Sequence, residues 1–397
     1  MRDAQRQGLR RDRDRRREPV GRVTEDLLAA LRCDPEIPAP DLVAVDAADR
    51  LLLDEAAPVL AGAAPGTVVV IGDRYGAVTL GAVARSRAVG VRAHTDRLTG
   101  ELALAANAAR VGGAGAFRSL DRLGPELVAG ARVVLLLLPR SLDALDEIAG
   151  LIARHADPGV AVVAGGREKH MSRSMNEVLA RHFADVRASR GRQKARVLHA
   201  SGPRAGASTS WPVRERHADL GLTVCAHGAA FAGSRVDIGT RFLVDHLAGA
   251  LPDARRAVDL GCGTGVLASA LASARPEIEV VATDESAAAV ASARATVEAN
   301  GLADRVRVQR ARGTAGIDDA SVDLVLLNPP FHVGAAVHDG VARVLFGEAA
   351  RVLRPGGELW CVWNSGLGYR PVLQTAVGPT RQVARNPKFT ITASVRA

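Results

Sequence analysis

Short runs of apolar residues alternate along the chain with longer alanine-rich segments that have helical spacing. Runs without a polar residue at every second position are typical of parallel strands that are buried on both faces. Strands that alternate with helices predict a doubly wound α/β sheet. In the first half we expect strands at 67–71, 91–96, 132–138 and 160–164, with helices at 101–110 and 142–155.

The second half repeats this pattern. Strands are expected at 222–230, 258–260, 280–284, 322–327 and 358–363, with an alanine-rich helix up to residue 300 and another at 342–353. Three landmarks recur at almost the same separation: Gly72 and Gly261, Asp96 and Asp284, and Pro139 and Pro329 are 189, 188 and 190 residues apart. A nearly constant offset favours duplication of one α/β unit over a strand spacing that two unrelated domains share.

The length of 397 residues and the hydrophobic content of 47% fit two globular domains. Residues 201–212 are rich in Gly, Pro, Ser and Thr, as interdomain linkers are. The predicted division is a tail at 1–20, a first domain at 21–200, a linker at 201–220 and a second domain at 221–397. The tail holds eight arginines and four acidic residues without apolar periodicity, so it is expected to be disordered.

The distribution of apolar residues and cysteines indicates a cytoplasmic protein. The longest apolar run, 133–138, is far shorter than the roughly 20 residues that span a bilayer, and residues 1–20 lack the apolar core of a secretion signal. The four cysteines form no C-x-x-C pair, which argues against a zinc site and a disulfide framework. We therefore expect no metal and no membrane contact.

A formal net charge of +9 favours polyanionic partners. Of the 52 basic residues, however, only Lys169, Lys194 and Lys388 are lysines. So strong an arginine bias in an alanine- and glycine-rich chain is also what a GC-rich genome produces. The charge is therefore only weak support for a nucleic-acid partner.

A glycine loop follows the strand that ends at Leu260, in the sequence Val-Asp-Leu-Gly-Cys-Gly-Thr-Gly. Gly261, Gly263 and Gly265 allow a sharp turn and a close approach to a ligand at the carboxyl edge of the sheet. The next helix offers free N–H groups at its start. Because the G-x-G-x-x-G spacing of a pyrophosphate site is missing, a nucleoside-type cofactor is favoured over NAD.

Two aspartates accompany the glycine loop. Asp259 is expected to order the loop or to bind the ammonium group of the cofactor through a water. Asp284 ends the next strand, where an acidic residue can hold a ribose diol by two contacts. The place of the usual adenine contact is occupied by 311–314, Ala-Arg-Gly-Thr, so the backbone, Thr314 or another segment has to supply it.

A second loop, Asn328-Pro329-Pro330-Phe331, is predicted to present a planar amine to the cofactor. Such an amine is a poor nucleophile, and the Asn328 side-chain oxygen and the Pro329 carbonyl are two acceptors for its N–H groups. The two prolines make this loop rigid, which preorganises both acceptors, and Phe331 can stack on a base. His332 is interpreted as a residue that orders the loop rather than as a base. Two prolines alone are common in turns, so the prediction depends on the pairing with the glycine loop.

Together the two loops resemble those of class I methyltransferases that use S-adenosylmethionine. From about residue 40 the chain resembles the bacterial ribosomal RNA guanine-N2 methyltransferases, the large-subunit (23S) type more than the small-subunit (16S) type. The resemblance also covers 46–49, 192–196, 231–242, 353–359 and 386–389. It implies S-adenosylmethionine as cofactor and ribosomal RNA, a subunit or an assembly intermediate as partner. It also places Thr240 in a segment that covers the cofactor.

The resemblance further implies two tandem Rossmann-like methyltransferase domains, the first of them degenerate. The first half has Gly-Asp-Arg-Tyr-Gly at 72–76 instead of the glycine loop, and Leu-Pro-Arg-Ser at 138–141 instead of Asn-Pro-Pro-Phe. We expect this half to bind no cofactor and to help hold RNA through phosphate contacts. The candidate residues are Arg167, Lys169, Arg190, Arg192, Lys194 and Arg196.

Two other functions remain open from the sequence. A glutamine N5-methyltransferase acting on a release factor has a similar Asn-Pro-Pro loop, but it usually carries Tyr at the position of Phe331 and has a small helical first domain. A non-catalytic ribosome-assembly factor with a vestigial cofactor loop is the other alternative, and the unusual residues at 311–314 keep it open. The target nucleotide and the oligomeric state are outside what the sequence predicts.

Overall fold

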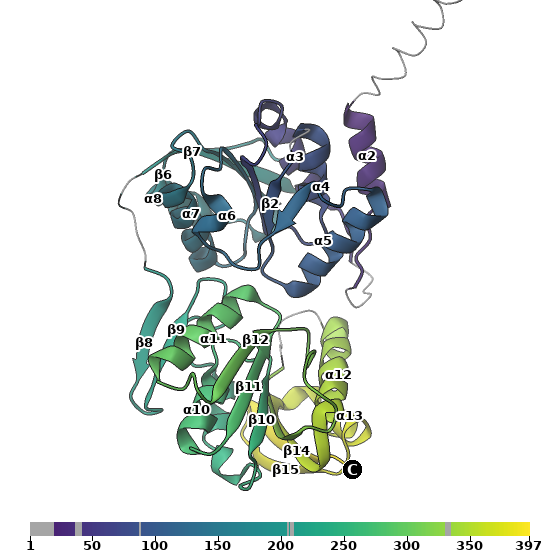
Figure 1. Cartoon of the computed structure of the whole chain (residues 1–397), viewed down its shortest axis with the longest axis vertical. Helices are drawn as coiled ribbons and strands as arrows, with labels where there is room; N and C mark the ends of the chain where they lie inside the picture. Colours follow the sequence, from purple (N-terminus) through teal and green to yellow (C-terminus); the bar gives the residue numbers. More distant parts are fainter. Residues whose placement is uncertain (1–19, 36–41, 87–88, 205, 207–209, 330–334) are drawn as a thin grey trace, which may run out of the picture. The chain divides into compact units, whose positions relative to one another are not determined.

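The computed structural model describes residues 20–35, 42–86, 89–204, 206, 210–329 and 335–397 (Figure 1). The chain divides into two compact units. The N-terminal unit comprises residues 1–95, 100–140 and 148–207, and the C-terminal unit comprises 96–99, 141–147 and 208–397. No helix among the described residues is long and apolar enough to cross a membrane.

The N-terminal unit is built on a seven-stranded sheet whose first five strands are parallel. In sheet order the strands are β3 (Phe117–Ser119), β2 (Val91–His94), β1 (Val68–Ile71), β4 (Val133–Leu137), β5 (Ala161–Arg167), β7 (Ala195–Pro203) and β6 (Phe183–Ala188). The helices are α2 (Val20–Ala30), α3 (Ala47–Leu60), α4 (Ala77–Ser86), α5 (Leu98–Val111), α6 (Pro125–Val128), α7 (Leu142–His155) and α8 (Arg173–His182), with a 3-10 turn η1 (Glu168–His170). The first residues of α5 and α7 are assigned to the C-terminal unit.

The C-terminal unit has a sheet of the same kind. In sheet order its strands are β12 (Val306–Arg310), β11 (Glu279–Asp284), β10 (Arg256–Leu260), β13 (Val322–Leu327), β14 (Leu353–Asn364), β16 (Phe389–Val395) and β15 (Thr380–Arg385). A separate hairpin pairs β8 (Val213–His217) with β9 (Leu222–Ala226). The helices are α9 (Ile238–Val244), α10 (Val266–Ala274), α11 (Ala287–Ala299), α12 (Ala335–Val352) and α13 (Arg370–Ala376), with 3-10 turns η2 (Leu247–Gly249) and η3 (Ser365–Leu367).

Burial on both faces explains the continuous apolar runs. All six residues of β13 are buried. Leu324 and Leu326 join a core that includes residues of α10 and α11, whereas Val325 and Leu327 join a core that includes residues of α12 and α13. Successive side chains of a strand point to opposite faces, so one apolar run supplies both cores. The C-terminal unit therefore has three layers, with helices on both sides of the sheet.

The two sheets have the same strand order, which agrees with the predicted tandem fold and with the duplication. The offsets of two landmarks are nevertheless wrong by one residue. Ile71 pairs with His94, and its counterpart Leu260 pairs with Thr283, so Asp284 corresponds to Thr95 and not to Asp96. Matching residue types in the sequence cannot detect this shift, because the register is fixed by hydrogen bonds between strands.

Several segments differ from the prediction. Strand β7 continues to Pro203 and β8 spans Val213–His217, so residues 201–203 and 213–217 of the predicted linker belong to strands. Strand β14 begins at Leu353 and runs through Pro355, where the sequence predicts a helix stop. The antiparallel pairs β6–β7 and β15–β16 are missed because polar residues interrupt their outer strands, so that neither strand has more than two apolar residues in a row. The predicted tail lies outside the described residues apart from Val20, which begins α2.

Candidate active site

The candidate site lies at the carboxyl edge of the C-terminal sheet. Strands β10, β11 and β13 are neighbours, and they end at Leu260, Asp284 and Leu327. The glycine loop (residues 261–265) and Asn328 follow directly. Parallel strands therefore bring together residues that are up to 67 positions apart in the sequence.

The three glycines of the loop have different roles. All have positive φ angles, 73° at Gly261, 53° at Gly263 and 77° at Gly265, which other residues rarely adopt. A Cβ atom at Gly261 or Gly263 would meet no atom of the described structure within 4 Å, whereas one at Gly265 would lie 3.0 Å from the Cβ of Ala293 on α11. The first two glycines thus border open space suited to a ligand, and the third allows close helix packing.

Asp259 orders the helix that follows the loop. Its carboxylate is fully buried, and Oδ2 accepts a hydrogen bond of 2.9 Å from the backbone N–H of Ala268 on α10. Oδ1 has no hydrogen-bond partner among the described residues. Burial raises the pKa of Asp259 to about 7. The sequence suggests two roles for Asp259, ordering the loop or binding the ammonium group of the cofactor. The hydrogen bond from Ala268 supports the first of them.

Asp284 connects the glycine loop to the neighbouring strand. Its Oδ2 accepts a hydrogen bond of 3.0 Å from the N–H of Gly263, and Oδ1 accepts one of 2.9 Å from the N–H of Ser286. Burial raises the pKa of Asp284 to about 6, although the two backbone N–H groups oppose this shift. Each carboxylate oxygen can accept further hydrogen bonds. Asp284 can consequently hold the loop and still bind the hydroxyl groups of a ligand.

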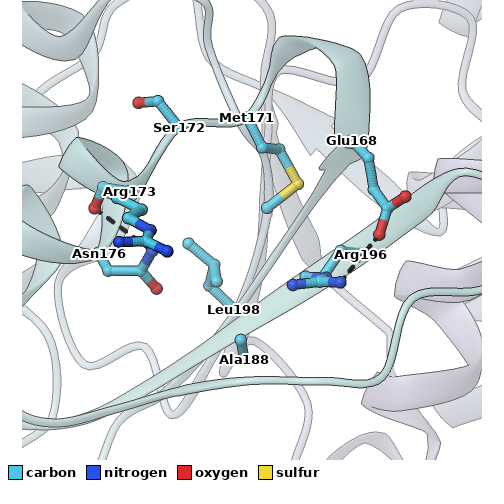
Figure 2. Close-up of a pocket in the computed structure, with 8 residues that line it drawn as sticks. All are labelled: Glu168, Met171, Ser172, Arg173, Asn176, Ala188, Arg196 and Leu198. Atoms are coloured by element: carbon cyan, nitrogen blue, oxygen red, sulfur yellow. Dashed lines mark hydrogen bonds and ion pairs between the residues drawn. The ribbon is translucent and has the colours of Figure 1, made fainter.

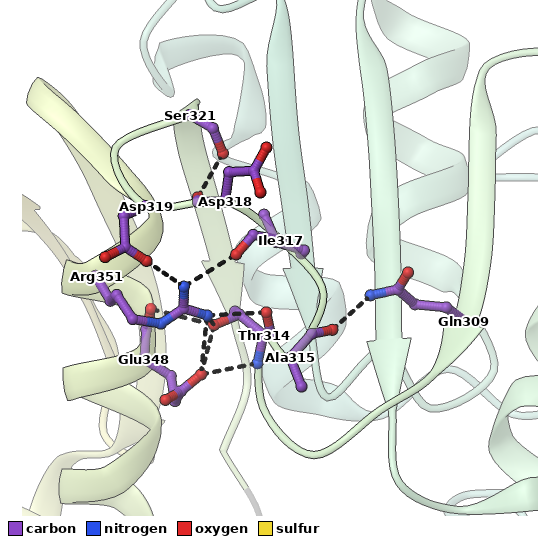
Figure 3. A network of polar contacts seen from close by, with 9 residues as sticks. All are labelled: Gln309, Thr314, Ala315, Ile317, Asp318, Asp319, Ser321, Glu348 and Arg351. Carbon is purple, nitrogen blue, oxygen red and sulfur yellow. Dashed lines mark hydrogen bonds and ion pairs between the residues drawn. The ribbon is translucent and has the colours of Figure 1, made fainter.

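The hydroxyl group of Thr314 forms its hydrogen bonds with other side chains of the protein. Its hydroxyl is fully buried, donates to Glu348 Oε2 at 2.6 Å and accepts from an Arg351 nitrogen at 2.8 Å (Figure 3). Of the sources that the sequence leaves open for the adenine contact, the Thr314 side chain is therefore excluded. The network instead fixes the loop after β12 to α12, the helix that follows the Asn-Pro-Pro-Phe segment.

Asn328 is held by two residues that precede the glycine loop in the sequence. Its Nδ2 donates to the Thr240 hydroxyl at 2.9 Å and to Asp237 Oδ2 at 3.1 Å. Its Oδ1 is buried and has no hydrogen-bond partner among the described residues. Pro329 is also buried, whereas Pro330, Phe331 and His332 lie outside the described residues. The side-chain oxygen of Asn328 is thus an acceptor that the described structure leaves unused.

Thr240 is predicted as a cofactor contact, and the structure places its hydroxyl against Asn328 instead of against the glycine loop. Asp237 is missed as a separate site residue. It is the N-cap of α9, and Oδ2 accepts from the N–H groups of Gly239 and Thr240 at 2.9 and 3.1 Å. An aspartate before a short helix is the usual sequence signal of such a cap. Nothing in the sequence indicates that the same oxygen reaches Asn328.

The corresponding loop of the N-terminal unit is closed by its own side chains. Asp73 is buried and accepts hydrogen bonds from the N–H groups of Gly76 at 3.0 Å and Thr79 at 2.7 Å. The side chain of Tyr75 is buried as well, with 3% exposed. A Cβ atom at Gly72 would lie 3.1 Å from the Leu137 carbonyl oxygen, where its counterpart Gly261 borders open space. This loop offers no room of the kind that the C-terminal loop has.

No group of three or more His, Cys, Asp or Glu residues within the described ranges is arranged to hold a metal ion. The residues that the C-terminal unit brings together at the edge of its sheet are the carboxylates of Asp259 and Asp284, the glycine loop and the Asn328 amide. This set fits an organic cofactor with hydroxyl groups and a substrate that donates hydrogen bonds.

Comparison with known proteins assigns a family model to each unit. Residues 23–204 match the model described as the RLMG N-terminal domain, and residues 221–393 match the methyltransferase small domain. A Streptomyces coelicolor protein named ribosomal RNA large subunit methyltransferase G is 39% identical over 370 residues, which cover 91% of this chain and 96% of the relative. A Pseudomonas aeruginosa protein of the same name is 39% identical over 368 residues, with coverages of 90% and 94%.

Among solved structures, a T. thermophilus 16S rRNA N2 methyltransferase in complex with AdoMet and guanosine has a TM-score of 0.70. The match covers 89% of this chain and 92% of that chain at 22% sequence identity. At this level of identity the likeness concerns the fold, and it includes both units.

Proposed function

The chain belongs to the ribosomal RNA large subunit methyltransferase G family, and from this membership we propose that it methylates the exocyclic N2 amine of a guanine in ribosomal RNA. As a member of the family it is an S-adenosylmethionine-dependent methyltransferase that acts on ribosomal RNA. The proposal adds the nucleobase and the nitrogen. The single observation that carries it is the buried Oδ1 of Asn328, which has no hydrogen-bond partner in the described part of the chain and follows the strand next to the glycine loop.

The chemistry of an exocyclic amine explains why such an acceptor is needed. The lone pair of N2 is delocalised into the guanine ring, so the nitrogen becomes nucleophilic only as it turns tetrahedral. An acceptor that binds its N–H group favours that geometry, and Asn328 Oδ1 is fixed in advance in a water-poor site. The Pro329 carbonyl is the proposed second acceptor. A neutral amide oxygen suits a group that becomes positively charged in the transition state.

The residues of the glycine loop fit S-adenosylmethionine. Gly261 and Gly263 leave open space at the edge of the sheet, and Asp284 is placed to accept hydrogen bonds from the ribose hydroxyls. When bound, this cofactor supplies an electrophilic methyl group on a sulfonium: the C–S electron pair stays on sulfur, the new bond uses the N2 lone pair, and one N2 proton leaves to solvent. We propose that Asp259 and Gly265 act through the shape of the loop, and Thr240 through Asn328.

The proposal is tested by methyl transfer from labelled S-adenosylmethionine to purified 23S RNA, 16S RNA and a release factor in parallel. Wild type is compared with Asn328→Ala, and the product nucleoside is identified by mass spectrometry. N2-methylguanosine in one RNA, lost in the variant while cofactor binding persists, is the expected result. Label in the release factor, or a different methylated nucleoside, would overturn the guanine N2 assignment.

We propose that the N-terminal unit holds the RNA, at a basic surface around a pocket on the side of α8 (Figure 2). The pocket has a volume of about 360 Å³. Arg173 and Asn176 of α8 lie on one side and Arg196 and Glu168 on the other, and Leu198 belongs to the floor. An apolar floor between planar guanidinium groups suits an unpaired base.

The charges around the pocket support this role. The side chains of Arg167, Lys169, Arg173, Arg190 and Lys194 form no ion pair with any described residue, so they are available for phosphates. Of the other two predicted contacts, Arg196 pairs with Glu168 and Arg192 with Asp54.

His170 lies on the 3-10 turn beside the pocket, and its pKa is lowered. This shift responds to the electrostatic potential around the pocket. Partial desolvation is the largest cause, and the positive charges of Arg140, Lys169 and Arg167 add to it. A local positive potential is what contact with an RNA backbone requires.

A further inference from the structure

We infer that Asp237, together with Thr240, is a positioning device that fixes which end of the Asn328 amide faces the substrate. This inference rests on the proposed function, because it explains how the acceptor for the substrate amine is aimed. The side chains of Asp237 and Asn328 are 91 positions apart in the sequence, and they meet at Asp237 Oδ2.

An Asn side chain has two orientations, which exchange the positions of its oxygen and its nitrogen, and the neighbouring hydrogen-bond partners decide between them. An ionised carboxylate can only accept hydrogen bonds, so the Nδ2 end of Asn328 must face Asp237. The Thr240 hydroxyl oxygen takes the other Nδ2 hydrogen at 2.9 Å. Both hydrogens of Nδ2 are then used within the protein. Only Oδ1 remains for the substrate.

The opposite orientation is disfavoured on two counts. It would place Asn328 Oδ1 against the Asp237 carboxylate, where two acceptors repel. It would also leave the NH₂ group in the buried position of Oδ1, where it would point a donor at the N–H groups of the substrate amine. A site with that orientation could not stabilise the developing positive charge on nitrogen. Aiming the amide is therefore a condition for catalysis.

Asp237 is itself held by the first turn of α9, which fixes the position of its carboxylate. Its Oδ2 accepts hydrogen bonds from the N–H groups of Gly239 and Thr240 as the cap of α9. A Cβ atom at Gly239 would lie 3.1 Å from that oxygen and 3.1 Å from Cε1 of Phe389, the first residue of β16. Even one methyl group at position 239 would crowd the carboxylate and the ring behind it.

The test uses Asp237→Ser, because serine caps a helix about as well as aspartate but its hydroxyl both donates and accepts. Thr240→Val removes one acceptor at nearly constant shape, and Thr240→Ser keeps it. Asp46→Ser is the matched control, since Asp46 caps α3 in the N-terminal unit by the same kind of contact. Single-turnover rates at saturating RNA and S-adenosylmethionine are measured with the affinities for both.

We expect Asp237→Ser and Thr240→Val to lower the single-turnover rate about 10- to 100-fold, with both affinities within about twofold of wild type. Thr240→Ser should restore most of the rate, and Asp46→Ser should leave it unchanged. Gly239→Ala, which keeps every functional group but crowds Asp237, should also slow the reaction. A merely structural role would lower thermal stability and leave these rates intact.

Two results would overturn the inference. One is an unchanged single-turnover rate in Asp237→Ser and Thr240→Val. The other is a loss of S-adenosylmethionine affinity that accounts for the whole loss of rate, because the two residues would then act through the cofactor. The product nucleoside is identified in the same experiments. If it is not N2-methylguanosine but the variants still lose rate at constant affinity, the positioning role stands and only the substrate assignment fails.

Discussion

Leu137 occupies in the N-terminal sheet the position that Asn328 occupies in the C-terminal sheet. Ile71 pairs with Leu136, and its counterpart Leu260 pairs with Leu327, so the next residues, Leu137 and Asn328, are equivalent. An apolar side chain thus stands where the active unit has its amide. Comparison of the two halves by sequence alone sets Leu138 against Asn328, which is one residue beyond the true equivalent, Leu137. The correction strengthens the case that the N-terminal unit lacks the acceptor.

The first prediction is that each chain binds one molecule of S-adenosylmethionine, in the C-terminal unit. The closed loop at Gly72 and the open loop at Gly261 are the physical reason. Gly261→Ala should weaken cofactor binding at least tenfold, because the methyl group enters the space that the ligand needs and the residue has a φ of 73°. Titration calorimetry gives both stoichiometry and affinity.

Gly301→Ala is the matched control for this prediction. Gly301 has a similar φ of 66°, and a Cβ atom there would also meet nothing within 4 Å, so the backbone strain is comparable. This glycine follows α11 and is outside the glycine loop. Equal losses of affinity in both variants would show that strain, not ligand contact, is responsible. A stoichiometry of two would contradict the degenerate N-terminal unit.

The sequence predicts the strands that are buried on both faces, because their apolar runs are unlike any surface segment. It also places Gly261 and Asn328 at strand ends, which is enough to bring them to one edge of a parallel sheet. It does not reveal the partner of Asn328, since the contact with Asp237 depends on how α9 packs against the sheet. The sequence does not reveal the contacts of Thr314 for the same reason: its partners Glu348 and Arg351 are 34 and 37 positions later, on α12.

The second prediction concerns the pH dependence of cofactor binding. Asp284 has a pKa raised to about 6, and its ionised form is the better acceptor for a ribose diol. The affinity for S-adenosylmethionine should therefore rise as the pH increases through about 6 and level off above it. Calorimetry in buffers of different ionisation enthalpy should show proton release near that pH. Asp284→Asn should bind more weakly, and its affinity should not change across this range.

The same carboxyls affect stability in the opposite direction. A group whose pKa is higher in the folded chain binds protons more tightly there than in the unfolded chain. For Asp259 the window runs from the ordinary value of 3.8 to about 7, so its contribution to the free energy of unfolding falls as the pH rises across that window. Asp259→Asn should remove this part of the pH dependence in denaturant titrations. An unchanged pH slope would contradict the raised pKa.

The third prediction concerns the network of Thr314, Glu348 and Arg351. Burial alone would raise the pKa of Glu348, but hydrogen bonds from Thr314 and the charge of Arg351 hold it below its usual value. A lowered pKa stabilises the folded chain above the ordinary pKa, and the effect is lost as the pH falls through the folded value. Glu348→Gln should therefore reduce the free energy of unfolding at pH 7 by up to about 1 kcal/mol, because solvent screens this partly exposed carboxylate.

Denaturant titration at pH 7 and near pH 4 tests this prediction. The difference between wild type and Glu348→Gln should shrink at the lower pH, because the carboxyl of the wild type is then increasingly protonated. Arg118 pairs with Glu126 at a largely exposed site, so Glu126→Gln is a control that should change stability little at either pH. Similar losses in both variants would mean that burial of the network contributes nothing.

The fourth prediction concerns the basic surface of the N-terminal unit. Lys169→Ala and Arg173→Ala remove charges that pair with no described residue, so they should weaken RNA binding without changing the rate at saturating RNA. Each lost phosphate contact should reduce the slope of log affinity against log salt by roughly 0.7 to 1. Fluorescence anisotropy with a labelled ribosomal RNA fragment measures both quantities.

Arg122→Ala is the control, because Arg122 is a highly exposed cation that follows β3 instead of bordering the pocket. It should leave the salt slope unchanged if RNA binds at the pocket. An equal loss in Arg122→Ala and Arg173→Ala would instead show that RNA is attracted by net charge, and the pocket would have no specific part in binding.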